Sequence, residues 1–138
     1  MTTKLADIPV TAETAVTVNL PPVLHEILHG VQQLRAAGTP SVVDLQAMPF
    51  GPGERDRLLA LLGEGEVAAR VNALGETRIK ESRFPGVWVV EHLNLEGQPI
   101  ALQIEIAEAP ALLRTPEADL ADSERLLREA VEALGARN

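Results

Sequence analysis

Two histidines and a glutamate near the start of the chain have the spacing of a zinc-protease motif. His25, Glu26 and His29 spell the pattern H-E-x-x-H. Histidines four residues apart lie on one face of a helix, where both can bind zinc while the glutamate acts as general base. A catalytic zinc also needs a third protein ligand and an open position for water. The motif therefore predicts a small zinc hydrolase only if the chain supplies that third ligand.

A third ligand is not evident from the sequence. The extended motif H-E-x-x-H-x-x-G-x-x-H does not continue, because Gln32 and Arg35 replace the required glycine and histidine. Glu54 and His92 are the other ligand candidates, and neither belongs to a second motif. A helical wheel places the two motif histidines on the flank of an amphipathic helix. We therefore favour a solvated helix flank and keep the zinc hydrolase as the alternative.

The composition excludes several classes of function. Acidic residues outnumber basic ones 20 to 12, which gives a net charge of -8 and makes nucleic acid an improbable partner. The chain has no cysteine and hence no thiolate ligand for a metal or a cluster, and we expect no cofactor. No segment has the apolar run of a signal peptide or a membrane span. We expect a cytoplasmic protein that does not insert into a membrane.

The length of 138 residues fits one domain. Residues 1–20 are predicted to form a tail or an edge strand, and residues 21–138 a single domain. A helix is predicted from Pro21 to just before Gly38, because proline suits the first turn and glycine the end. Its expected apolar stripe is Leu24, Ile27, Leu28, Val31 and Leu34. Residues 41–47 are predicted to form a short buried strand, and residues 54–62 a short helix that stops at Gly63.

The middle of the chain alternates with the period of two that is typical of strands. Residues 67–73 and 77–83 form one predicted hairpin, and residues 87–93 and 100–107 form a second. A last helix is expected to begin near Glu117 and to end at Gly135, with a stripe of Leu120, Leu127, Val131 and Leu134. The predicted fold is α+β, with an antiparallel sheet of two consecutive hairpins, one short additional strand and about three helices.

Two of the three aromatic residues flank the predicted break between the hairpins. Phe84 and Trp88 lie on either side of Pro85-Gly86, and strand alternation places Trp88 on the face opposite Val87. Tryptophan is enriched both in cores beneath helices and in binding hot spots. The sequence leaves these two interpretations open.

Longer stretches of the chain resemble a known family. "PPVLHEILHGVQQL", "LLGEGEV" and "ESRFPGVWVVEH" are similar to the conserved C-terminal region of the HupH/HyaF hydrogenase expression/formation proteins. The similarity runs from about Pro21 to about Leu113. Its motif residues are Gly63, Glu64, Gly65, Glu66, Phe84, Pro85, Gly86, Val87 and Trp88.

The resemblance implies an accessory protein of [NiFe]-hydrogenase maturation, associated with the iron-sulfur small subunit, and it implies no catalytic residue. The expected partners are the small-subunit precursor and other hydrogenase accessory proteins. The predicted partner-binding residues are Phe84, Pro85, Gly86, Val87, Trp88, Glu64 and Glu66. A homodimer formed through the hairpin edges or the helix flank is a further possibility.

Overall fold

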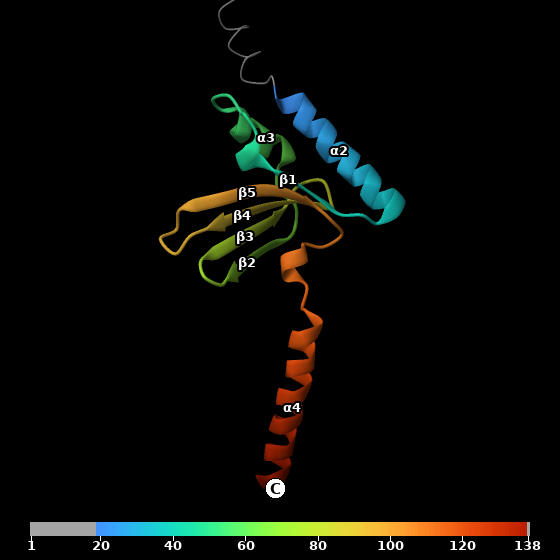
Figure 1. The fold of residues 1–138 in the computed structure, drawn as a ribbon, viewed down its shortest axis with the longest axis vertical. Coiled ribbons are helices and arrows are strands. Elements are labelled where there is room, and N and C mark those ends of the chain that lie inside the picture. The colour runs from blue at the N-terminus through green and yellow to red at the C-terminus, as the bar shows by residue number, and fades with distance from the viewer. Residues whose placement is uncertain (1–18, 138) are drawn as a thin grey trace, which may run out of the picture.

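The computed structural model describes residues 19–137 and is built on one antiparallel sheet (Figure 1). The strand order is β1-β5-β4-β3-β2. The strands are β1 (Ser41–Asp44), β2 (Ala68–Asn72), β3 (Glu76–Glu81), β4 (Val87–Leu93) and β5 (Pro99–Ile106). β2 to β5 form a meander, and β1 pairs with the free edge of β5. The predicted α+β class is confirmed, as are the two hairpins and the additional strand.

Three helices accompany the sheet in the part of the chain that the structure describes. α2 (Leu20–Ala37) and α3 (Glu54–Leu62) lie on one side of it, whereas α4 (Glu117–Arg137) extends away from the other side (Figure 1). Two short 3₁₀ turns are η1 (Leu45–Ala47) and η2 (Ala111–Leu113). The predicted tail or edge strand lies mostly outside the described residues, but Leu20 is the first residue of α2. Within residues 19–137, no helix has the length and hydropathy that a transmembrane segment requires.

The two faces of the sheet carry separate apolar clusters. The larger cluster joins one face to α2 and α3, and its buried members are Leu20, Val23, Ile27, Val43, Leu45, Leu58, Leu62, Val87, Leu102, Ile104 and Ile106. Ile79, Trp88 and Val90 form the smaller cluster on the opposite face. Successive strand residues point to opposite faces, so the predicted separation of Val87 from Trp88 is confirmed.

α2 packs through four of the five residues of the predicted stripe, and its buried face is shifted away from the fifth, Leu28. Leu28 is exposed, whereas Val23 and Gly30 are buried with Ile27. A Cβ atom at Gly30 would lie 2.6 Å from Cδ1 of Ile106, so the missing side chain lets the helix approach β5 closely. The centre of the buried face was predicted wrongly, because a glycine has no apolar side chain that would mark its position as buried.

Three further boundaries or faces differ from the prediction. The predicted strand at residues 41–47 is too long, because the Asp44 side chain accepts a hydrogen bond from the Gln46 amide and opens a 3₁₀ turn. The last helix continues past Gly135 to Arg137, and none of its residues is buried. Ile100 is exposed instead of facing the core, since it lies beyond the register shift that follows His92.

Candidate functional site

The fold brings the two family-like motifs side by side. The Gly65 amide donates to the Glu81 carbonyl at 2.7 Å, and the Glu81 amide donates to the Val67 carbonyl at 2.9 Å. The Arg83 amide donates to the Leu62 carbonyl at 2.8 Å, which fixes the end of α3 against the β3–β4 turn. Residues 63–67 thus run along residues 81–83. We call residues 63–67 and 82–88 together the motif junction.

A glycine makes this close approach possible. A Cβ atom at Gly65 would lie 2.5 Å from the backbone oxygen of Ser82 and 2.7 Å from Oε1 of Glu81. The same Glu81 oxygen accepts a hydrogen bond from the Glu66 amide at 3.2 Å. The second glycine of "GEGEV" is therefore explained by the close contact between two backbones.

The turn between β3 and β4 presents one aromatic ring to solvent. Pro85 and Gly86 occupy its two central positions, Gly86 has φ +92°, and the Val87 amide donates to the Phe84 carbonyl at 3.0 Å, as in a type II turn. The buried Ser82 hydroxyl accepts a hydrogen bond from the Phe84 amide at 3.1 Å. Phe84 itself is 44% exposed.

The remaining predicted contact residues divide into exposed and buried groups. Glu64, Glu66 and Pro85 are exposed, as is Phe84. Val87 and Trp88 are buried, and the Trp88 indole N–H donates to the Ala107 carbonyl at 3.0 Å. Trp88 therefore supports the junction from within the second cluster, and a partner would meet the exposed group.

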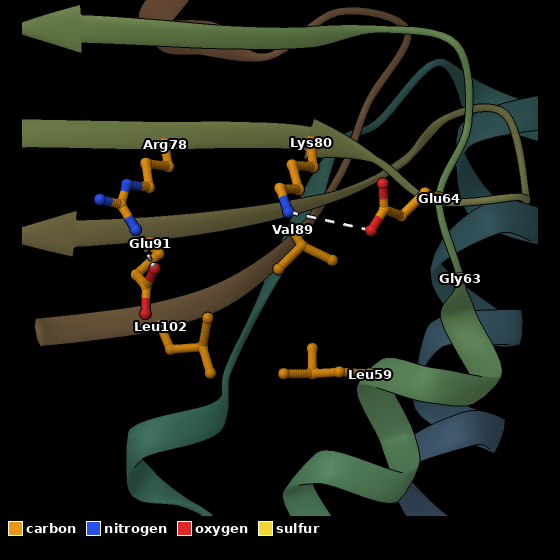
Figure 2. Close-up of a pocket in the computed structure, with 8 residues that line it drawn as sticks. All are labelled: Leu59, Gly63, Glu64, Arg78, Lys80, Val89, Glu91 and Leu102. Carbon is orange, nitrogen blue, oxygen red and sulfur yellow. Dashed lines mark ion pairs between the residues drawn. The ribbon is translucent and has the colours of Figure 1, made fainter.

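A groove of about 220 Å³ opens next to the junction, between α3 and the helix-covered face of the sheet (Figure 2). Its apolar lining comes from Leu59, Val89 and Leu102. Gly63 and the charged side chains of Glu64, Arg78, Lys80 and Glu91 complete it. The groove thus combines an apolar surface with both signs of charge.

The charges around the groove are weakly paired with one another. Lys80 Nζ lies 4.0 Å from Glu64 Oε2, and Arg78 lies 4.0 Å from Glu91 Oε1. Arg78 also donates to Glu76 at 2.6 Å, and this hydrogen bond lowers the pKa of Glu76 below its ordinary value. Exposed pairs of this length contribute little to stability, so they can exchange for contacts with a ligand.

Sequence reasoning did not identify the groove. Its signal was present in the alternation of residues 76–81, where Ile79 faces the second cluster and Arg78 and Lys80 must therefore face the helix side. Two charges on the core side of a strand indicate that the core ends there. The sequence does not show, however, that α3 leaves this part of the sheet uncovered.

The candidate zinc ligands lie apart from one another. The two motif histidines are exposed on α2, whereas Glu54 is buried and accepts a hydrogen bond from the Asn19 amide at 2.7 Å. His92 Nδ1 lies 2.8 Å from the Thr77 hydroxyl oxygen on β3. Residues 19–137 contain no group of three His, Asp or Glu side chains that could hold a metal ion. The zinc-hydrolase alternative has no support in this geometry.

Comparisons with known proteins agree on one family. Residues 17–134 match the family model described as HupH hydrogenase expression protein, C-terminal conserved region. The hydrogenase expression/formation protein HoxQ of Azotobacter vinelandii is 36% identical over 118 residues, which are 84% of this chain and 42% of HoxQ. HupH of Rhodobacter capsulatus is 30% identical over 117 residues, which are 85% of this chain and 42% of that protein.

A solved structure shares the fold. The hydrogenase expression protein HupH from Thiobacillus denitrificans superimposes with a TM-score of 0.79 at 36% identity, covering 83% of this chain and 96% of the other. The chain spans less than half the length of the curated relatives it matches. These likenesses apply to the whole region that contains the motif junction and the groove.

Proposed function

The chain belongs to the HupH hydrogenase expression protein family, and we propose that it is a non-enzymatic accessory protein of [NiFe]-hydrogenase maturation that binds the immature iron-sulfur small subunit. The observation that carries the proposal is the convergence of "GEGEV" and "FPGVW" into one junction beside a groove. The names of the relatives support a role in hydrogenase formation. The identity of the client is our own inference.

The chemistry of the junction suits recognition of a polypeptide. Phe84 offers an exposed ring, and the Arg83 guanidinium carbon lies 4.7 Å from the centre of that ring in a cation–π contact. An exposed aromatic residue is typical of a binding hot spot, and Gly63 and Glu64 of the same junction line the groove. The 138 residues include no cysteine, so this segment cannot hold an iron-sulfur cluster through thiolates. These features support binding of a client polypeptide by the junction.

The groove also favours a particular kind of client segment. Its apolar lining would receive aliphatic side chains, Glu64 lines its junction end, and Glu66 is exposed two residues further along the chain. A segment with apolar and basic residues would pair with these carboxylates and exclude water from the lining. We therefore expect a basic, partly apolar stretch of the small-subunit precursor to occupy the groove.

Co-purification with the small-subunit precursor tests the proposal. Phe84→Ala removes an exposed ring without opening the core, and we expect the affinity for the precursor to fall about tenfold or more. Leu95→Ala is a matched control, because Leu95 is 80% exposed in the β4–β5 turn at the opposite end of the sheet. Equal recovery of the precursor by wild type and both folded variants would exclude the junction as the binding surface.

A further inference from the structure

α4 is a helix without a packing partner in the described chain. It spans 21 residues, and none of them is buried. Four apolar side chains repeat along it and are more than half exposed: Leu120 (52%), Leu127 (66%), Val131 (66%) and Leu134 (63%). We call these four residues the α4 seam. Since the stability of protein helices comes mostly from packing an apolar face, the seam should be covered in the working molecule.

The geometry of the seam indicates another helix as the cover. Its residues are spaced by seven, four and three, so at about 100° per residue they fall within a stripe of roughly 60°. A helix that packs on a globular core has a stripe of about 100° or more, whereas the narrower stripe is typical of a coiled-coil contact. Leu126 lies about 110° from the centre of the seam and is not part of it.

The charges of α4 select the partner and its direction. Residues 117–124 carry four acidic side chains and no basic one, whereas residues 125–137 carry three arginines and two glutamates. A parallel copy would place the acidic half beside another acidic half. An antiparallel copy places it beside the arginine-containing half, with Arg137 near the partner's Asp119 and Asp122. α4 is therefore complementary to itself in the antiparallel direction only.

We propose that α4 is a dimerisation helix, and that its seam packs antiparallel against α4 of a second copy of this chain. The same surface is then used by both copies around a two-fold axis, which closes the assembly at two chains. Leu127 and Val131 of each helix meet across the axis, and Ala130 lies close to it. The proposal does not depend on the identity of the client.

The mass of the protein in solution tests the interface. At about 100 μM, well above the micromolar Kd of a small interface, light scattering should give twice the chain mass of 14.8 kDa. Leu127→Glu should raise the Kd about 100-fold, because each dimer loses two buried leucines. Leu126→Glu is the matched control, since its side chain is 55% exposed and lies off the seam. A monomeric wild type, or equal loss of dimer in both variants, would overturn the proposal.

Single cysteines test the direction of pairing, since the chain has none of its own. Ala130→Cys should form an intermolecular disulfide under mild oxidation, because position 130 lies close to the two-fold axis. Ser123→Cys lies on the same flank of the seam, but an antiparallel pair separates its two copies by about 18 Å along the axis at 1.5 Å per residue. Equal cross-linking at both positions would indicate a parallel pair, and none at either in a dimer would place the interface elsewhere. Either result would contradict the proposal.

Discussion

Glu54 shows how a single buried acid can connect the first turns of two helices. Its side chain is fully buried and accepts hydrogen bonds from the amides of Asn19 at 2.7 Å and Gly51 at 3.0 Å. Burial alone would raise the pKa of Glu54, but these hydrogen bonds outweigh it and hold the pKa below its ordinary value. The carboxylate is charged in the folded protein and fixes the start of α2 to the start of α3.

The lowered pKa of Glu54 makes the stability of the protein depend on pH. A group with a lower pKa in the folded state stabilises the fold above its unfolded pKa of about 4.3, and this stabilisation is lost as the pH falls through the folded pKa. Glu54→Gln should lower the urea midpoint at pH 7. Below about pH 4.3, the urea midpoint of this variant should decrease less steeply with falling pH than that of the wild type. The single tryptophan, Trp88, is buried and reports unfolding by fluorescence. Glu96→Gln is the control, because Glu96 is exposed. If the two variants had the same stability at each pH, the buried hydrogen bonds of Glu54 would not contribute to stability.

Gly65 is the residue on which the motif junction depends most directly. Gly65→Ala would push a methyl group against the Ser82 carbonyl and displace the loop, at a cost of about 1–3 kcal/mol in the free energy of unfolding. Hydrogen exchange of the Glu81 amide, which donates to Val67, should become faster. Glu64→Ala changes an exposed side chain in the same loop and should leave this amide protected. Unchanged exchange in Gly65→Ala would show that the loop does not need the glycine.

At the scale of elements, Gly30 sets how α2 lies on the sheet. Ala favours a helix over Gly by about 1 kcal/mol, yet a Cβ at position 30 would lie 2.8 Å from the Ser41 hydroxyl oxygen and even closer to the buried Ile106. Gly30→Ala should therefore destabilise the protein by about 1–2 kcal/mol in spite of its helix propensity. The measurement is urea unfolding followed by Trp88 fluorescence.

Gly135→Ala separates the two effects. Gly135 is also helical, but nothing lies within 4 Å of a Cβ built on it. The substitution should keep the propensity gain in α4 without any clash, so helicity should rise and the urea midpoint should not fall. A loss of stability in Gly135→Ala equal to that in Gly30→Ala would remove the packing explanation.

The elements that were predicted well are those fixed by local pattern. Period-two alternation identified the two hairpins, and Pro85-Gly86 identified the turn between them, because backbone pleat and turn geometry follow directly from residue type. The face of α2 was predicted apart from Leu28, and the contact at Gly30 was missed because a glycine adds no side chain to the apolar pattern. The environment of α4 was not predictable, since a hydrophobic stripe indicates that a helix is covered and does not identify the cover.

The candidate site was predictable in its parts and not in its assembly. The motif residues around Gly65 and Phe84 were identified, but only tertiary hydrogen bonds show that the two segments touch. Burial of Trp88 was one of two open interpretations, and the hydrogen bond to Ala107 decides it. The groove depends on how far α3 reaches over the sheet, which is a property of packing and not of any short stretch of sequence.

At the scale of the whole molecule, the two proposed surfaces are separate. The groove lies on the side of the sheet covered by α2 and α3, and α4 leaves from the opposite side (Figure 1). Pairing of two copies through α4 therefore leaves both grooves open. A dimer would present two client sites that face away from the shared helix pair, so loss of dimerisation and loss of client binding can be measured as independent events.

Removal of α4 tests this separation. Because no residue of α4 is buried, a chain that ends at Arg114 should keep its sheet, its motif junction and its affinity for the client. Dimerisation stabilises a fold by mass action, so the urea midpoint of the full chain should rise with protein concentration, whereas that of the shortened chain should not. At concentrations low enough to dissociate the dimer, the two should unfold within about 0.5 kcal/mol of each other. A shortened chain that is unfolded, or less stable at every concentration, would show that α4 packs on its own sheet.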